Sequence, residues 1–184
     1  YVGGDFSVIL WWKPTSVSQI QVLWSIRNPD SSGDHWVQLH FSNSNESLNL
    51  GEDDTSAFSY SRNYAGISVN HWNCIVAARK NGMLQLFVNG VLKGSGASNK
   101  SPVFGLGHYH FIGAHYDTAY PVSGSLALFR YSLSAPTYDQ VKQIWQDERK
   151  LFQPNAKCTL FGTSSDVNDI AYDSSTEILH AGTS

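Results

Sequence analysis

Residues 71–94 read HWNCIVAARKNGMLQLFVNGVLKG, and this stretch decides the fold. Asn-Gly pairs at positions 81–82 and 89–90 interrupt its apolar runs. Such a pair favours a two-residue hairpin turn, because type I′ turns need positive φ at both central residues. The sequence therefore predicts an antiparallel meander of three strands, at residues 72–79, 83–88 and 91–93.

Short strands are also predicted on either side of this meander, by apolar runs or by alternating apolar and polar residues. They cover residues 6–12, 20–27, 36–41, 108–113 and 124–131. One helix is expected after the last of them, because apolar residues from Tyr138 to Phe152 recur with helical spacing. Ser134 is expected to cap this helix and Pro154 to end it. Many short strands with one late helix predict an all-β antiparallel sandwich.

The composition excludes several classes of protein. The chain has 184 residues, a formal net charge of −3, 15% charged residues and 13% aromatic residues. Scattered Lys and Arg residues give no basic surface for nucleic acid, so no nucleic-acid partner is expected. No apolar run reaches the length of a transmembrane helix, so no membrane span is expected. The abundant aromatic residues argue against disorder and indicate a globular domain.

Four segments carry a resemblance to a known family. They read FSVILWWKP at residues 6–14, HWNCIVAARKNGMLQLFVNGVLKG at 71–94, FIGA at 111–114 and SGSLALFRYSLSAPTYDQVKQIWQDERKLF at 123–152. In this order they resemble the laminin-G-like branch of the concanavalin A-like lectin/glucanase superfamily. The resemblance implies a jelly roll of two antiparallel sheets over residues 1–153, with one short C-terminal helix.

Residues 154–184 differ in character from the sandwich. Short strands are predicted at residues 158–161, 169–172 and 178–181, so we expect a small β-hairpin appendage, the start of a further domain. Residues 151–184 are similar to segments that follow such domains in bacteriophage tail or other virion proteins. This resemblance implies a virion, extracellular or cell-surface location. It also implies other virion proteins, or further copies of this chain, as partners.

The catalytic motifs of the superfamily are not matched. Its retaining glucanases use a Glu-x-Asp-x-x-Glu strand, because the chemistry needs two carboxylates about 5 Å apart. The nearest sequence here, Glu52-Asp53-Asp54, sends neighbouring side chains to opposite faces and is interpreted as a solvated acidic turn. Gln38 and His40 imitate one strand of alginate-lyase-type jelly rolls, but the other motifs of those enzymes are missing. We therefore predict that the chain is not an enzyme.

The strongest candidate for a ligand site is a segment rich in His, Tyr and Asp. Sugars bind by stacking apolar C–H faces on aromatic rings and by hydrogen bonds to polar side chains. The predicted ligand-binding residues are Trp36, His108, Tyr109, His110, His115, Tyr116, Asp117 and Tyr120. His108 and His110 are expected on one strand face. One interpretation is that the two side chains form a transition-metal site with Asp117. The other, which we favour, is that they point into solvent.

Metal binding and disulfide formation are left open by the sequence. No cofactor is required by a motif, but calcium is common in the family that the chain resembles. Asp30, Asp34 and Asp117 are the loop carboxylates that would hold calcium. Cys74 and Cys158 either form one disulfide or remain free buried thiols, which is the alternative that we favour.

These observations favour a non-catalytic recognition module that binds a glycan or another ligand on a host surface. The alternative is a structural or assembly domain of a virion protein, whose aromatic surface makes protein–protein contacts. A third hypothesis is a diverged glycan-active enzyme. A glycan array and the oligomeric state separate the first two hypotheses, and product release from polysaccharides tests the third.

Overall fold

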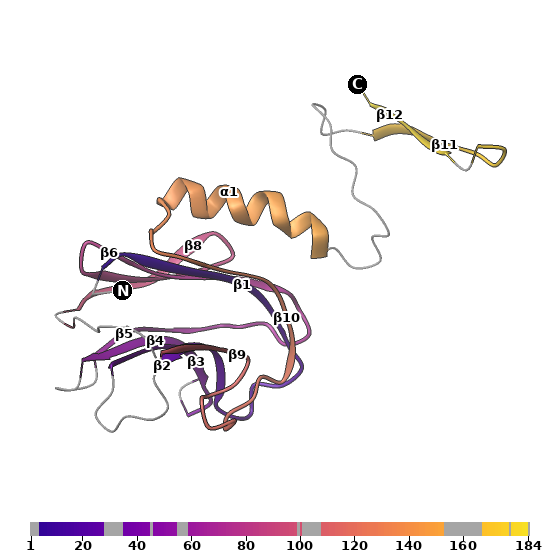
Figure 1. The fold of residues 1–184 in the computed structure, drawn as a ribbon. Coiled ribbons are helices and arrows are strands. Elements are labelled where there is room, and N and C mark those ends of the chain that lie inside the picture. The colour runs from indigo at the N-terminus through magenta and orange to yellow at the C-terminus, as the bar shows by residue number, and fades with distance from the viewer. Residues whose placement is uncertain are drawn as a thin grey trace. The chain divides into compact units, whose positions relative to one another are not determined.

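The computed structural model describes residues 4–27, 35–44, 46–54, 59–98, 100, 108–152, 167–176 and 178–183. The chain divides into two compact units, Tyr1–Arg149 and Lys150–Ser184 (Figure 1).

The first unit is a sandwich of two five-stranded antiparallel sheets, which are stacked on each other (Figure 1). Its strands are β1 (Phe6–Pro14), β2 (Gln21–Arg27), β3 (His35–Ser42), β4 (Ser47–Asp54), β5 (Ser59–Ala65), β6 (Asn73–Lys80), β7 (Met83–Val88), β8 (Val91–Ala97), β9 (Tyr109–Ile112) and β10 (Gly124–Ser132). The first sheet has the order β10-β1-β6-β7-β8, and the second has the order β5-β4-β3-β2-β9. This architecture confirms the predicted all-β sandwich.

The predicted meander forms β6, β7 and β8. Lys80 pairs with Met83 and Val88 pairs with Val91, so each turn contains only an Asn-Gly pair. The φ angles of that pair are 50° and 74° in the β6–β7 turn and 52° and 76° in the β7–β8 turn. Both central residues therefore have the positive φ that a type I′ turn requires.

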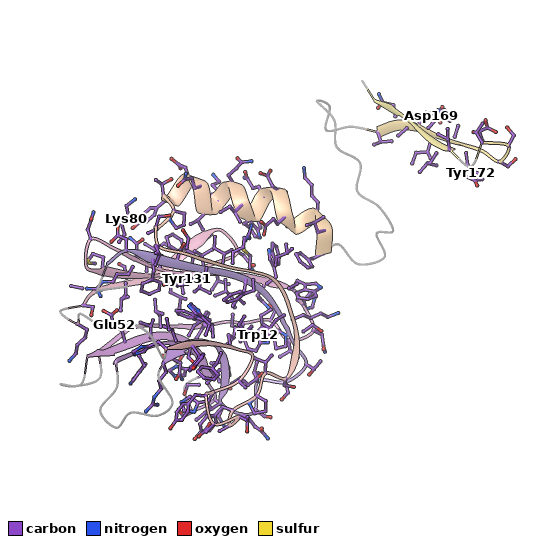
Figure 2. The ribbon with its side chains drawn as sticks, in the orientation of Figure 1. Trp12, Glu52, Lys80, Tyr131, Asp169 and Tyr172 are labelled. Carbon is purple, nitrogen blue, oxygen red and sulfur yellow. The ribbon has the colours of Figure 1, made fainter. Side chains whose placement is uncertain are left out.

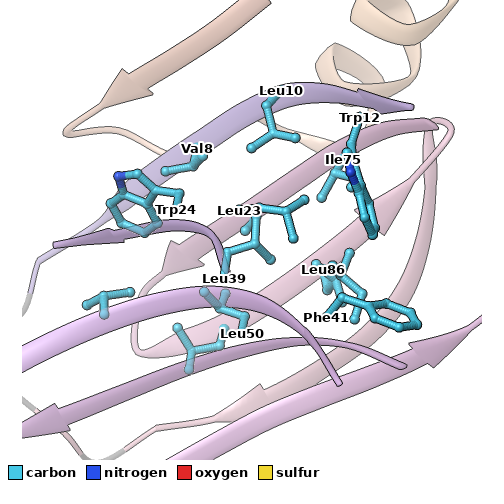
Figure 3. Close-up of a cluster of buried hydrophobic side chains, with 14 of the residues drawn as sticks. Val8, Leu10, Trp12, Leu23, Trp24, Leu39, Phe41, Leu50, Ile75 and Leu86 are labelled. Carbon is cyan, nitrogen blue, oxygen red and sulfur yellow. The ribbon is translucent and has the colours of Figure 1, made fainter. Parts of the chain in front are cut away.

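Apolar side chains from both sheets fill the space between them (Figure 3). Trp12 of β1 and Trp24 of β2 are among the largest, with exposed fractions of 0% and 1%. The ring of Trp12 lies 5.8 Å from that of Phe41, and the ring of Trp24 lies 6.1 Å from that of Phe6. Burial of one large apolar side chain contributes roughly 2–3 kcal/mol, so this core is the main source of stability for the first unit.

A buried ion pair joins the two sheets. Glu52 of β4 lies opposite the core residue Val37 and is fully buried, so its side chain points between the sheets (Figure 2). Its Oε2 lies 3.2 Å from Nη1 of Arg79 on β6. Arg79 also donates through Nη2 to the carbonyl of Lys100, at 2.7 Å. The interpretation of residues 52–54 as a solvated acidic turn is wrong, because β4 continues through them and strand alternation turns Glu52 inward.

The predicted helix is confirmed as α1 (Tyr138–Glu148), which continues into a 3-10 helix (Arg149–Phe152). Its cap is Thr137, whose hydroxyl accepts a hydrogen bond from the N–H of Gln140 at 3.2 Å. The Gln140 side chain accepts in return from the N–H of Thr137, at 2.8 Å. This capping box corrects the predicted cap at Ser134. Among the described helices, none has the length and apolar character needed to cross a membrane.

The helix α1 packs on the outer face of the first sheet (Figure 1). Val141 is buried there against an apolar cluster from β1, β6 and β7. Near the end of the helix, a Glu148 oxygen accepts from the indole N–H of Trp11 at 2.7 Å. The Glu148 carboxylate also accepts from both Nη atoms of Arg130, at 2.5 and 2.9 Å. Glu148 thus fastens the helix to β1 and β10.

Replacing Glu148 with Gln is expected to lower the free energy of unfolding by about 1–2 kcal/mol, because it removes a charge-assisted pair and weakens the bond to Trp11. Urea unfolding followed by tryptophan fluorescence measures this loss. Asp147→Asn is the matched control, since Asp147 is exposed and accepts from the exposed Gln143. Equal losses in the two variants would contradict this role of Glu148.

The second unit contains an antiparallel hairpin of β11 (Val167–Asp173) and β12 (Ile178–Thr183). These strands coincide with the last two strands predicted for the appendage. The other predicted strand, residues 158–161, lies outside the described residues, as does Pro154.

Candidate ligand-binding face

The second sheet has one face toward the core and one face toward the outside, here called the outer sheet face. Alternate residues of β3, including Val37 and Leu39, are buried in the core. Successive side chains of a strand point to opposite faces. Trp36, Gln38 and His40 therefore lie on the outer sheet face.

Strand pairing places a row of large side chains across the outer sheet face. Trp36 of β3 pairs with Arg27 of β2, and Arg27 pairs with Tyr109 of β9. The guanidinium carbon of Arg27 lies 4.2 Å from the centre of the Tyr116 ring. The ring of Phe111 lies 6.5 Å from that of Tyr116. We call these five residues the aromatic patch.

Polar groups continue the outer sheet face beside the aromatic patch. Gln38 of β3 and Ser25 of β2 form the next row along the strands, in line with Phe111 of β9. Gly51 of β4 is paired with Gln38 and contributes no side chain. Tyr109 is 56% exposed, so part of the aromatic surface is open to solvent. Aromatic rings beside the Gln38 amide have the chemistry needed to bind a sugar, whereas Ser25 is buried.

Hydrogen bonds within the loop that follows β9 hold the backbone on both sides of Tyr116. The N–H of His115 donates to the carbonyl of Ala119, and the N–H of Thr118 donates to the carbonyl of His115, each at 2.9 Å. The Asp117 carboxylate accepts from the N–H of Ala119 at 2.9 Å and lies 2.8 Å from Nδ1 of His115. The N–H of Ala119 and then the His115 side chain lower the pKa of Asp117. The loop conformation is therefore well defined before any ligand binds.

Tyr120 lies in a separate pocket, here called the rim pocket. The pocket has a volume of about 340 Å³ and is lined by Gln19, Ile20, Asn43, Tyr120 and Pro121. The Tyr120 side chain is 48% exposed. Six of the eight predicted ligand-binding residues are thus divided between the aromatic patch, the loop after β9 and the rim pocket, and the other two are His108 and His110.

His110 has a structural role that the sequence did not indicate. It pairs with the buried Ile26, so it lies on the core-facing side of β9. Its Nδ1 accepts from the indole N–H of Trp24 at 3.0 Å, and its ring lies 4.5 Å from that of Tyr131. Partial burial lowers the pKa of His110 and favours the neutral ring that this hydrogen bond requires. The His110 side chain is still exposed, as expected, but its ring faces Trp24 and Tyr131 rather than pointing freely into solvent. His108 precedes the strand.

The predicted transition-metal site is not assembled by the described residues. Within the described ranges, no three His, Cys, Asp or Glu side chains come together. Asp117 is bonded inside its own loop, and His110 accepts from Trp24. Asp30 and Asp34 lie outside the described residues, so the calcium site stays a prediction.

Cys74 is a buried free thiol on β6. Burial raises the pKa of Cys74 to about 12, so the thiol is protonated at neutral pH. It behaves as a small apolar residue of the sheet. Cys158 lies outside the described residues.

His40 makes the stability of the chain depend on pH. Burial lowers the pKa of His40 from 6.5 to about 4, so the unfolded chain binds a proton more readily than the folded chain. Stability is therefore expected to be full above about pH 7 and to fall as the pH drops from about 6.5 toward 4. His40→Gln should flatten this slope, which urea unfolding at a series of pH values measures. An unchanged slope would contradict the assignment.

Two stacked antiparallel sheets with an open aromatic face define a lectin-like jelly roll, and comparison with known proteins agrees. Residues 2–142 match the family model described as the concanavalin A-like lectin/glucanases superfamily. The chain belongs to this superfamily. A comparison with curated proteins finds no match.

Several solved structures share the fold. Domain 4 of an extracellular arabinanase from Geobacillus stearothermophilus, in complex with arabinotriose, is 21% identical with a TM-score of 0.64, covering 79% of this chain and 68% of that one. The CBM40 of a Ruminococcus gnavus IT-sialidase, bound to α2,3-sialyllactose, is 17% identical with a TM-score of 0.63, covering 77% and 82%. Domains LG4-5 of the mouse laminin α1 chain are 14% identical with a TM-score of 0.55, covering 70% and 35%. At these identities the similarity establishes the fold alone.

The structure also adds residues that sequence reasoning missed. Arg27 and Phe111 join the aromatic patch through the pairing of β2 with β9, which is remote in sequence. Ile20 and Asn43 join Tyr120 in the rim pocket. No local motif marks these four residues, because strand pairing and loop packing bring them to the site.

Proposed function

We propose that the first unit is a non-catalytic recognition module that binds glycans through its outer sheet face. The observation that carries this proposal is the row of Trp36, Arg27 and Tyr109, with the ring of Tyr116 stacked on Arg27. Trp36 and Tyr109 flank Arg27 in this row, and aromatic rings on a sheet offer flat surfaces to the apolar faces of sugar rings. The amide of Gln38 lies in the next row, where it reaches sugar hydroxyls.

Preorganisation favours this binding role. The hydrogen bonds of the loop after β9 fix Tyr116 without a ligand. Ordering a loop during binding costs free energy, and a loop that is already ordered avoids this cost. The outer sheet face itself is built on regular strands, which hold side chains more accurately than loops.

The positions of two glutamates support a non-catalytic role. Glycoside hydrolysis needs two carboxyl groups that flank the substrate bond. Glu52 is buried in its ion pair with Arg79, and Glu148 is bound to Arg130 on the side of the first sheet. Both carboxylates are therefore engaged in holding the fold together.

Structurally similar domains support a sugar ligand and a surface location. One structurally similar domain is in complex with arabinotriose, and another is bound to sialyllactose. We infer that this chain also works outside the cell or on a surface. A virion location, with other virion proteins as partners, remains a prediction from the sequence of residues 151–184.

A glycan array probed with the intact chain, with and without EDTA, tests this proposal. We expect a restricted set of glycans to be retained, and retention in EDTA would show that calcium is not needed. No retained glycan, together with a stable oligomer in light scattering, would favour the assembly role instead. Release of products from a retained polysaccharide would overturn the non-catalytic assignment.

A further inference from the structure

The two Asn-Gly turns of the meander have the same backbone geometry but different surroundings. Their φ angles agree to within 2°, at 50° and 74° in one turn and 52° and 76° in the other. An Asn side chain followed by Gly can cyclise onto the backbone, because glycine leaves its own N–H unhindered. Any difference in reactivity between the two turns must therefore come from side-chain contacts and packing.

The β7–β8 turn is held tightly. The Oδ1 of Asn89 accepts from the N–H of Cys74 at 2.9 Å, and the N–H of Asn89 donates to the Cys74 carbonyl at 2.8 Å. Gly90 packs against α1, since a Cβ built on it would lie 3.1 Å from the Trp145 ring. The Asn89 carboxamide cannot turn toward the Gly90 nitrogen without breaking these contacts.

The β6–β7 turn is much less constrained. Asn81 is exposed, and its carboxamide makes no hydrogen bond to any described residue. Its N–H donates to the Asp5 carboxylate at 2.8 Å, which leaves the side chain free to rotate. A Cβ built on Gly82 would be 3.8 Å from its nearest neighbour, the Ser98 carbonyl oxygen.

We propose that Asn81 is a site of spontaneous deamidation and isoaspartate formation, and that Asn89 is protected by its packing. The Gly82 nitrogen loses its proton to solvent base and attacks Cγ of Asn81. The Cγ–Nδ2 bond breaks as the Asn81 side-chain nitrogen takes a proton from solvent, and ammonia leaves to give a cyclic succinimide. Water then opens the ring at either carbonyl and yields aspartate or isoaspartate at position 81.

This change would weaken one end of the first sheet. The isoaspartyl product adds one methylene to the main chain of the turn and so disturbs the hydrogen bond from the Ser98 N–H to the Gly82 carbonyl. Either product also places a new carboxylate beside that of Asp5. The neighbouring pair of Arg79 with Leu84 lies at the same end of the β6–β7 ladder. Modified protein should therefore unfold at a lower urea concentration.

Incubation of the full chain in mildly alkaline buffer, followed by isoaspartyl methyltransferase labelling and peptide mapping, tests the proposal. We expect isoaspartate to accumulate at least about tenfold faster at Asn81 than at Asn89, because local opening is far easier in the exposed turn. The same chain in concentrated urea is the control, and there the two sites should react at similar rates. Asn81→Ser should remove most of the labelling, whereas Asn89→Ser should leave it unchanged. Equal rates in the folded chain, or faster reaction at Asn89, would overturn the proposal.

Discussion

Replacement of Arg79 by Met is expected to lower the free energy of unfolding by about 3–5 kcal/mol, because it removes the guanidinium that pairs with the buried Glu52 carboxylate. Arg79 is 5% exposed and Glu52 is fully buried, so water cannot readily replace the missing guanidinium. The variant also loses the bond from Arg79 to the Lys100 carbonyl. Chemical denaturation of the full chain measures the loss.

Two further variants separate the buried charge from a general effect of the substitution. Lys80→Met removes the next cation on the same strand and should cost much less, since Lys80 is more exposed. The double variant Glu52→Leu with Arg79→Met replaces both charges and should recover most of the loss, because an apolar pair carries no desolvation penalty. A double variant as unstable as Arg79→Met alone would contradict the account.

Tyr116→Ala is expected to weaken glycan binding by roughly 5–150-fold, which corresponds to about 1–3 kcal/mol for a central aromatic contact. The reason is that the Tyr116 ring, which stacks on Arg27, is the member of the aromatic patch that comes from the loop after β9. Isothermal titration with a glycan retained on the array measures the affinity.

Two control variants accompany this prediction: one keeps an aromatic ring at position 116, and the other removes a tyrosine outside the aromatic patch. Tyr116→Phe should retain most of the affinity, because stacking does not need the hydroxyl. Tyr138→Ala removes a tyrosine that is 53% exposed on α1, and it should leave the affinity unchanged. Equal losses from Tyr116→Ala and Tyr138→Ala would show that the aromatic patch is not the binding surface.

Much of the fold could be predicted because its signals are local. The Asn-Gly pairs fix two turns of the meander, and alternation or apolar runs predict strands on either side. The helix cap was also predictable: Thr137 followed three residues later by Gln140 is a capping-box pattern, which is stronger than the lone Ser134. Glu52 likewise continues the inward alternation of Leu48 and Leu50, so its burial had a signal in the sequence.

The site was less predictable because it depends on contacts between remote segments. The pairing of β2 with β9 brings Arg27 to Tyr109, across more than eighty positions of sequence. The role of His110 depends on which face of β9 meets Trp24, and a four-residue strand gives too short a pattern to decide this. Composition suggested aromatic residues near a ligand, whereas strand register decides which of them share a face.

Mapping a bound glycan by NMR tests the central claim most directly. A glycan retained on the array would be titrated into the isotope-labelled chain while backbone and indole signals are followed. We expect the largest shifts at Trp36, Arg27, Tyr109 and Tyr116, with little change on α1. Shifts concentrated on α1 or on the first sheet, with the aromatic patch unchanged, would contradict the claim that the outer sheet face binds glycans.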